Sequence, residues 1–274
     1  MFLINGLFSE SVSAQDRGLH YGDGVFETIA IQNGKPLCWE AHYRRLQEGC
    51  IQLGMQCPTM DLLSAEICRL PVTGPRCVVK IIVTRGPGGR GYRPADPGPV
   101  PTRIIGYYPW PDYPPEYVSD GIKARICSTR LGKSPQLAGI KHLNRLEQVL
   151  ARGEWDEPDI AEGLMLDIHG TVIEGTMSNL FCIKDNVLNT PDLSACGIAG
   201  IIRECILEMS VQFNMQVSIR TFTETELYAA DELFLCNSVI GVWPIREIEQ
   251  RDFAIGPRTR EIRELLVRNE MIAA

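Results

Sequence analysis

A lysine at the junction of an apolar stretch and a helical pattern is a candidate for chemistry. Lys141 follows "LAGI" at residues 137–140 and precedes "HLNRLEQVLARGEW" at residues 142–155. Apolar surroundings favour the uncharged amine of a lysine, which is nucleophilic and can act as a base. Most lysines are instead solvated surface groups. A catalytic role for Lys141 therefore depends on suitable partners elsewhere in the chain.

The chain contains candidate partners for a lysine that bonds to an aldehyde cofactor with a phosphorylated pyridine ring. Such a cofactor needs a carboxylate for the ring nitrogen, an anion cup for the phosphate and a wall for the ring. Glu174 lies in the apolar pattern "TVIEGTMSNLF", and Gly197 and Gly200 precede a helical pattern whose first N–H groups could bind phosphate. Further candidates for the cup are Arg45, Asn237 and Ser238. Each also has an ordinary interpretation as part of a turn, a helix cap or a buried acid–arginine pair.

Two short motifs resemble nucleotide-binding loops but lack the required context. "GPGGRG" at residues 86–91 satisfies GxGxxG, yet "YRPADPGPVP" follows it and cannot form the helix that a dinucleotide site needs. We therefore expect a flexible loop over a cleft. "LGKSP" at residues 131–135 contains GKS, but Cys127 stands where a P-loop has its first glycine.

Composition excludes several functional classes. The chain has 274 residues, 45% hydrophobic residues and a formal net charge of -7, which is typical of an ordinary globular protein. It has no basic stripe for nucleic acid and no apolar run long enough to span a membrane, and its N-terminal residues lead us to expect no signal peptide. Ten cysteines without CxxC pairs favour buried thiols in a cytoplasmic protein over a metal site. We expect a small-molecule substrate, and neither a nucleic-acid nor a membrane partner.

The alternation of strands and helices predicts an α+β fold, because no regular βαβ repeat is present. "PWPDYPPEY" at residues 109–117 has four prolines in nine residues and reads as a linker. We predict a small domain at 1–108, a linker at 109–120 and a larger domain at 121–274. In the small domain we expect strands at 1–5, 26–40 with a turn at Asn33-Gly34, 76–86 and 102–108, and helices at 41–55 and 61–70.

The larger domain is predicted from the same periodicities. We expect a strand at 121–129, a helix at 142–155 and three strands within 162–191. A helix at 200–214, a capping box formed by Thr223 and Glu226, and one buried strand at 233–245 follow.

Six motifs together resemble the fold type IV pyridoxal-phosphate enzymes, the family of the branched-chain and D-amino-acid aminotransferases, over the whole chain. They are "DRGLHYGDGVFETI", H-x-x-R-L at 42–46, "GIKHLNRLEQVLA", E-G-T-x-S-N at 174–179, "GIAGIIRE" and "ADELFLCNS". The resemblance implies a two-domain enzyme with a small N-terminal α/β domain, a larger C-terminal domain with a mixed barrel-like sheet, pyridoxal 5'-phosphate as cofactor and a homodimeric assembly.

The resemblance also assigns roles at the matching positions. Lys141 would bond to the cofactor and Glu174 would partner its pyridine nitrogen. The other implied cofactor-binding residues are Arg45, Asn179, Ile198, Ile201, Ile202, Asn237 and Ser238, with Ile198 against the ring and the backbone N–H groups of Ile201 and Ile202 in the phosphate cup. The implied substrate residues are Phe26, Thr28, Arg90, Tyr92 and Tyr108. His42 would shape its helix, and no metal is expected.

Within the family, "RLGKSPQLAGIKHLNRLEQVLAR" and "GGRGY" resemble the aminodeoxychorismate lyases more than the aminotransferases. The resemblance implies conversion of 4-amino-4-deoxychorismate to 4-aminobenzoate and pyruvate, a step of folate biosynthesis. Phe26 stands where D-amino-acid aminotransferases usually have tyrosine, which also favours the lyase. A D-amino-acid or branched-chain aminotransferase is the alternative, because both activities share the cofactor residues.

Overall fold

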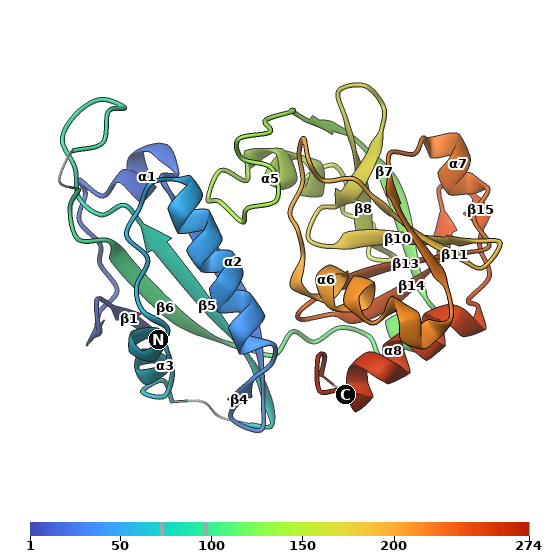
Figure 1. The fold of residues 1–274 in the computed structure, drawn as a ribbon, viewed down its shortest axis with the longest axis horizontal. Coiled ribbons are helices and arrows are strands. Elements are labelled where there is room, and N and C mark those ends of the chain that lie inside the picture. The colour runs from blue at the N-terminus through green and yellow to red at the C-terminus, as the bar shows by residue number, and fades with distance from the viewer. Residues whose placement is uncertain (72–73, 96–97, 274) are drawn as a thin grey trace. The chain divides into compact units, whose positions relative to one another are not determined.

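The computed structural model of the protein describes residues 1–71, 74–95 and 98–273 (Figure 1). The chain forms two compact units. One comprises Met1–Pro111 and Ile140–Asn144, and the other comprises Asp112–Gly139 and the chain from Arg145 onward. Lys141 therefore makes its contacts within the first unit, although it lies between two segments of the second.

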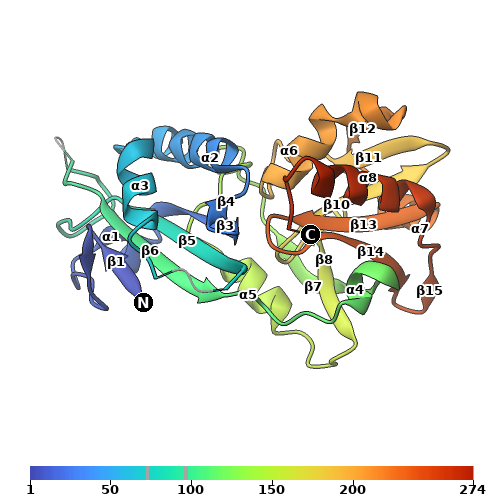
Figure 2. The same cartoon turned by 90° about the horizontal axis from the view of Figure 1, so that it is seen from below.

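An antiparallel sheet of six strands forms the centre of the first unit, in the order β2-β1-β6-β5-β3-β4. The strands are β1 (Phe2–Ile4), β2 (Leu7–Phe8), β3 (Gly24–Gln32), β4 (Lys35–Pro36), β5 (Arg76–Thr84) and β6 (Thr102–Pro109). The helices are α1 (Arg17–Tyr21), α2 (Trp39–Gln52) and α3 (Met60–Ile67), and Figure 2 shows α2 and α3 on one face of the sheet.

The side chains of the central strands alternate between the two faces of this sheet. Val25, Ile29 and Ile31 of β3 belong to the apolar core, together with Leu46 and Cys50 of α2. Phe26 and Thr28 must then point to the opposite face, away from the α2 side. The face that packs against α2 is therefore structural, and the face with Phe26 and Thr28 is available for a functional role.

The second unit is built on a mixed sheet of nine strands, in the order β12-β11-β10-β13-β14-β7-β8-β9, with β15 paired to β14. They are β7 (Ile122–Leu131), β8 (Ile160–Asp167), β9 (Val172–Gly175), β10 (Asn179–Lys184), β11 (Val187–Pro191), β12 (Gln216–Arg220), β13 (Glu232–Asn237), β14 (Gly241–Ile248) and β15 (Arg251–Asp252). Strand β9 ends the path, yet it also contacts β10 and β11 near the other end. The sheet therefore curls into a barrel-like shape.

Helices cover this sheet from several sides. They are α4 (Glu116–Ser119), α5 (Leu146–Arg152), α6 (Ile201–Glu208), α7 (Glu224–Tyr228), α8 (Pro257–Arg268) and the 3-10 turn η1 (Ser210–Phe213). Helix α8 contacts β13 and β14, α6 contacts β13, and α5 contacts β7 and β8. None of the helices in the described ranges is both long and apolar enough to cross a membrane.

Several predicted elements of the larger domain are wrong in their extent. The helix predicted at 142–155 begins only at Leu146, because residues 142 and 143 pair with β3 instead. The helix predicted at 200–214 ends at Glu208 and continues as the 3-10 turn η1. Helix α8 was not predicted at all. The capping box formed by Thr223 and Glu226 is confirmed.

Two strand predictions missed a reversal of the chain. Residues 162–191 form four strands rather than three, because a turn at 176–178 separates β9 from β10. Residues 233–245 form the hairpin β13–β14 rather than one strand. Asn237 makes this reversal possible, since its Oδ1 accepts from the N–H groups of Val239 and Ile240, and Gly241 adopts a positive φ of 65°.

All ten cysteines are free thiols, but they are not all buried as predicted. Cys68 is exposed, and Cys38 and Cys57 are half-buried, while the other seven are buried. Cys68 directly follows the last residue of α3, where the chain meets solvent.

A buried charge cluster joins α2 to β3. Glu27 accepts from Nδ1 of His42 at 2.6 Å and from Nε and Nη2 of Arg45 at 2.8 and 2.6 Å. Burial raises the pKa of Glu27, but the charge of Arg45 and the hydrogen bonds from His42 and Arg45 outweigh it and lower this pKa to about 2. Burial lowers the pKa of His42 despite its contact with Glu27. His42 is therefore neutral at neutral pH, with its proton on Nδ1.

Replacing Glu27 by glutamine should destabilise the first unit, because Arg45 would lose its buried counter-charge. Loss of one partner of a buried pair costs about 3–5 kcal/mol. The sign of the pH dependence follows from the lowered pKa: Glu27 stabilises the fold above its ordinary pKa of 4.5, and this contribution disappears as the pH falls towards 2.

Urea unfolding of the wild type, Glu27→Gln and Glu48→Gln between pH 7 and pH 2 measures this effect. Glu48 is an exposed acid on the same helix and serves as the control. The difference in unfolding free energy between wild type and Glu27→Gln should shrink as the pH falls through this window. A difference that is constant with pH would show that the carboxylate charge does not stabilise α2 against β3.

Candidate active site

The backbone of Lys141 is paired with strand β3. The N–H of Phe26 donates to the carbonyl of Lys141 at 2.9 Å, and the N–H of Leu143 donates to the carbonyl of Gly24 at 3.0 Å. His142 forms an isolated antiparallel bridge with Val25. The segment Ile140–Asn144 thus runs as an extra strand along the beginning of β3. This pairing aims Lys141, and Nζ lies 4.5 Å from the centre of the Phe26 ring.

One face of the six-stranded sheet brings together three predicted substrate residues. Phe26, Thr28 and Ala30 alternate with the core residues of β3 and so share this face. Ala30 lies opposite Val78 of β5, and Val78 lies opposite Tyr108 of β6, so Tyr108 points to the same face. Phe26 contacts the amine of Lys141 directly. The predicted nucleophile and this part of the predicted substrate set therefore belong to one surface of the first unit.

Lys80 on β5 is a residue of this face that the sequence analysis missed. It lies directly opposite Thr28, and its Nζ is 4.9 Å from the centre of the Phe26 ring. Two lysine amines thus contact one aromatic ring, and burial lowers the pKa of Lys80. A signal was available in the sequence, since a lysine inside "RCVVKIIV" interrupts an otherwise apolar strand.

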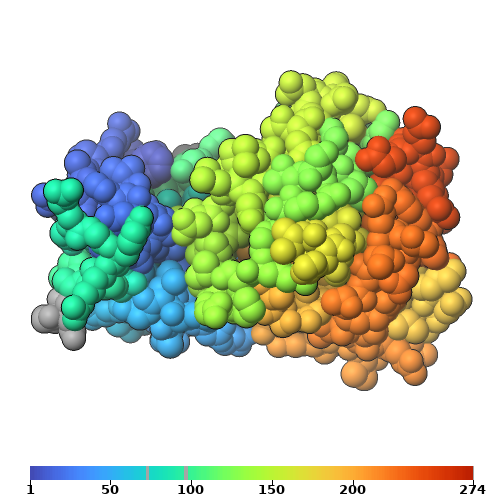
Figure 3. All heavy atoms as spheres, turned by 90° about the horizontal axis from the view of Figure 1, so that it is seen from above, coloured from blue at the N-terminus to red at the C-terminus, as the bar shows by residue number. Residues whose placement is uncertain are grey.

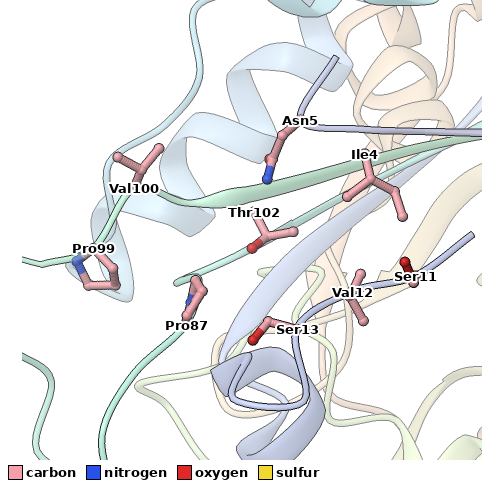
Figure 4. Close-up of a pocket in the computed structure, with 9 residues that line it drawn as sticks. All are labelled: Ile4, Asn5, Ser11, Val12, Ser13, Pro87, Pro99, Val100 and Thr102. Atoms are coloured by element: carbon pink, nitrogen blue, oxygen red, sulfur yellow. The ribbon is translucent and has the colours of Figure 1, made fainter. Parts of the chain in front are cut away.

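Arg90 and Tyr92, the other two predicted substrate residues, lie on the loop that follows β5. Both are exposed, with Tyr92 85% accessible. The stems of this loop, at Pro87 and Val100, border a cavity of about 450 Å³ beside the N-terminal segment (Figure 4). That cavity has no ionisable side chain in its lining and contains none of the predicted site residues, so it is not the candidate active site.

The second unit holds the predicted carboxylate within a connected set of hydrogen bonds. Glu174, at 3% exposure on β9, accepts from the N–H of Ile198 at 2.9 Å and from Nδ2 of Asn179 at 3.5 Å. Asn179 also donates to the carbonyl of Ile198 at 2.9 Å. The structure therefore brings three predicted cofactor residues together, and the backbone of Ile198 is held on both sides.

The start of helix α6 presents N–H groups that lack a side-chain cap. The N-cap residue is Gly200, which has no side chain that could accept from the first N–H groups. Ile201 and Ile202 are the first helical residues. Their side chains are buried, so their backbone N–H groups are the parts that a ligand would meet. A Cβ at Gly200 would collide with Oδ1 of Asn179, so a larger residue would displace the amide that holds the carbonyl of Ile198. The arrangement suits an anion at the helix N-terminus.

Asn237 and Ser238 sit at the turn of the β13–β14 hairpin. Oδ1 of Asn237 accepts from two backbone N–H groups of the turn, and Nδ2 donates to the carbonyl of Met177 at 3.0 Å. Asn237 thus links the hairpin to the 176–178 turn that follows Glu174. Ser238 is half-buried beside it, with a hydroxyl of the type that phosphate accepts from.

Glu162 on β8 is a second residue that sequence reasoning missed. It is fully buried and accepts from the hydroxyls of Thr176 and Ser178 and from the N–H of Met177. Burial outweighs these bonds and raises the pKa of Glu162. The carboxyl group organises the turn between Glu174 and Asn179. Its place in "AEGLML" gave no sign of this, because its partners are fourteen or more residues away.

Arg45 belongs to the Glu27 cluster between α2 and β3. Its Nε and Nη2 bind Glu27, which fixes the plane of the guanidinium group. Lys133, another lysine close to Lys141 in sequence, pairs with Asp167 at 2.9 Å and has a structural role.

Only one residue separates Gly139 from Lys141. Gly139 donates to the carbonyl of Gly197 at 3.0 Å and accepts from the N–H of Ala199 at 3.0 Å, so it pairs with the segment that carries Ile198. Lys141 follows two residues later, which is at most about 7 Å of extended chain.

Comparison with known proteins gives the context for these residues. The family model of amino-transferase class IV matches residues 24–248. The aminodeoxychorismate lyase of Vibrio harveyi is 39% identical over 269 residues, which is 96% of this chain and 98% of that protein. The solved structure of 4-amino-4-deoxychorismate lyase from Pseudomonas aeruginosa superimposes with a TM-score of 0.94 at 42% identity, covering 99% of this chain and 100% of that one.

A branched-chain amino acid aminotransferase from T.th., solved with pyridoxamine 5'-phosphate, is more distant. It is 25% identical with a TM-score of 0.85, covering 98% of this chain and 93% of that one. These likenesses confirm the predicted fold class, an α+β fold of type IV with a mixed barrel-like sheet. With a family model that matches most of its length and a relative 39% identical over nearly all of it, the chain belongs to the class IV aminotransferase family.

Proposed function

We propose that the protein is a pyridoxal-phosphate-dependent lyase that converts 4-amino-4-deoxychorismate to 4-aminobenzoate and pyruvate, a step of folate biosynthesis. One observation carries the proposal: the likeness to a 4-amino-4-deoxychorismate lyase extends over 99% of the chain at 42% identity. The aminotransferase structure that covers nearly the same length is only 25% identical. The alternative, a branched-chain or D-amino-acid aminotransferase, is therefore the weaker of the two.

The residues present have the chemistry that pyridoxal phosphate requires. Lys141 offers an amine, Glu174 a buried carboxylate for the pyridine nitrogen, and Ile198 an apolar residue for the ring. The N–H groups of Ile201 and Ile202, with Ser238 and its neighbour Asn237, suit the phosphate. Gly200 fits this role, because a Cβ there would meet Asn179 and crowd the start of α6. Arg45 would add a positive charge for the phosphate, with its orientation set by Glu27.

The bound cofactor supplies an electron-withdrawing ring that stabilises negative charge on the substrate carbon next to nitrogen. Once the amine of the substrate has replaced that of Lys141 on the cofactor, the freed Lys141 would remove the proton from this carbon, and the backbone pairing of Lys141 with β3 positions its amine for this task. Glu174 would hold a proton on the pyridine nitrogen. The bond between the neighbouring carbon and the ether oxygen then breaks, and the ring of the substrate becomes aromatic. The released enolpyruvate takes up a proton and becomes pyruvate. Because aromatisation drives this elimination, the main task of the protein is to place one base.

The open face of the six-stranded sheet suits the substrate. Phe26 and Tyr108 can contact its ring, and Thr28 offers a hydroxyl. Lys80 adds a positive charge on the same face, which suits one of the two substrate carboxylates. Arg90 and Tyr92 would act from their loop. A transaminase needs no enolpyruvyl group on its substrate, so pyruvate release from 4-amino-4-deoxychorismate separates the two activities.

Lys141→Ala should abolish both 4-aminobenzoate formation and covalent attachment of the cofactor, while the fold is retained. Incubation with pyridoxal phosphate, reduction with borohydride and peptide mass analysis locate the attachment without any turnover. The wild type and Lys133→Ala, the control, should both carry the label on the peptide that contains Lys141. A label on Lys133 or Lys80 would remove Lys141 from the proposed role, whereas labelled wild type without pyruvate release would contradict the lyase activity alone.

We also propose that the enzyme is a cytoplasmic homodimer. Ten free cysteines suit a reducing compartment. Helix α5 presents an apolar stripe to solvent, with Leu146, Val149 and Leu150 at 76%, 63% and 64% exposure. These residues are spaced i, i+3 and i+4, so they form one face of the helix. A second copy of the chain would cover this stripe.

Replacing Leu146 and Val149 together by glutamate should weaken the dimer by desolvating charge at its interface. Sedimentation velocity at micromolar concentrations should show a dimer for the wild type and a smaller species for the double variant. Val211→Glu is the matched control, because Val211 is 87% exposed but stands outside the stripe. A wild type that sediments as a monomer, or a double variant that remains dimeric, would contradict this interface.

A further inference from the structure

The loop that carries Arg90 is fastened to helix α1 rather than left free. Arg17, the first residue of α1, is 5% exposed although it is an arginine. Its Nη1 donates to the carbonyl of Gly91 at 2.9 Å, and its Nη2 donates to the carbonyl of Tyr92 at 2.8 Å. A single guanidinium group thus holds two consecutive carbonyls directly after Arg90. The flexible loop expected from the sequence has a built-in anchor.

Further contacts hold the same loop from its other side and at its base. The N–H of Gly91 donates to the hydroxyl of Tyr21 at 3.3 Å, and the rings of Tyr21 and Tyr92 are 5.4 Å apart. Gly88 packs on the aliphatic part of Arg17, since a Cβ there would lie 2.7 Å from Cδ. Figure 3 shows the turquoise atoms of this loop region against the blue atoms of the N-terminal segment.

Asp23 completes the anchor by orienting the guanidinium group. Its Oδ2 accepts from Nε of Arg17 at 2.8 Å and from Nε of Arg85 at 2.8 Å. Burial raises the pKa of Asp23, but the hydrogen bonds from Arg85 and Arg17 outweigh it and lower this pKa. The carboxylate is therefore ionised at neutral pH, and it fixes the plane in which Nη1 and Nη2 of Arg17 meet the loop.

We propose that Arg17 is a positioning residue for substrate binding, which acts by fixing the backbone of residues 86–92 so that Arg90 meets a substrate carboxylate. This rests on the proposed function for the role of Arg90. The side chain of Arg90 is exposed, and it forms no ion pair within residues 1–71, 74–95 and 98–273. Its backbone is ordered by Arg17 before the substrate arrives. Binding then avoids the entropy cost of ordering the loop.

Arg85 provides a matched control within the same cluster. It binds the same oxygen of Asp23, and its two Nη atoms donate to the carbonyls of Gly54 and Leu53 at 2.9 and 2.6 Å. Arg85 thus makes three hydrogen bonds in the same pattern as Arg17, but the carbonyls that it binds lie directly after α2 and not in the Arg90 loop. Loss of Arg85 should therefore disturb the cluster without releasing the Arg90 loop.

Limited proteolysis measures how firmly the loop is held, and it does not depend on the lyase activity. Trypsin can cut between Arg90 and Gly91, whereas Pro94 protects the bond after Arg93. In folded Arg17→Ala and Arg17→Lys proteins, cleavage at Arg90 should accelerate about tenfold or more, the factor expected for one lost charge-assisted hydrogen bond. Lysine keeps the charge but lacks the fork that reaches two carbonyls. Arg85→Ala should cleave at Arg90 at the rate of the wild type, and Arg90→Gln should remove the site.

Steady-state kinetics with the cofactor-loaded enzyme complete the test. Arg17→Lys should raise KM for 4-amino-4-deoxychorismate by about tenfold and leave kcat within about twofold, because Arg90 contributes uniform binding. Unchanged cleavage in both Arg17 variants, or equal acceleration in Arg85→Ala, would overturn the proposal. Faster cleavage with an unchanged KM would also overturn it, because fixing the loop would then have no effect on substrate binding. A wild type that releases no pyruvate would instead contradict the proposed function. The cleavage rates would still test the role of Arg17, because they do not depend on turnover.

Discussion

The short stretch around Lys141 is constrained by backbone pairing at both of its ends, and the proposed role of Lys141 depends on this constraint. On one side Lys141 and Leu143 pair with the start of β3, and on the other Gly139 pairs with the segment around Ile198. Backbone hydrogen bonds of this kind hold a side chain far more firmly than a loop could. The amine is consequently directed to the face of β3 that carries Phe26, while Ile198 is held by Glu174 and Asn179.

Two buried carboxylates and one half-buried carboxylate hold groups that we assign to ligand binding or positioning. Glu27 orients Arg45, Glu162 shapes the turn between Glu174 and Asn179, and Asp23 orients Arg17. Each carboxylate accepts several hydrogen bonds, which is the condition for burying such a group. None of the three is expected to contact the substrate. They act by holding cationic side chains and backbone groups in place.

The sequence was most informative where chemistry and local pattern coincide. Lys141 and Glu174 stand out because a charged residue in an apolar pattern needs an explanation, and the capping box formed by Thr223 and Glu226 depends on residues three positions apart. The helix expected at 142–155 failed because pairing with β3 overrides the helical periodicity of residues 142–145. Glu162 and Arg17 could not be found in this way, because their partners come from distant strands and loops, whereas Lys80 met the same criterion and was overlooked. The hairpin at Asn237 was hidden because apolar residues continue through the turn.

The central claim is that Lys141 removes a proton while Glu174 keeps the pyridine nitrogen protonated. Single-turnover kinetics of Glu174→Gln, using substrate deuterated at the carbon that bears nitrogen, test it most directly. Glutamine has nearly the same size, so cofactor attachment and substrate affinity should persist. Proton removal should slow on the order of a hundredfold, as expected for a lost electrostatic contact to developing charge, and this phase should show a deuterium isotope effect. A variant that retains the wild-type rate of this phase would contradict the account and leave Glu174 as a structural acid of β9.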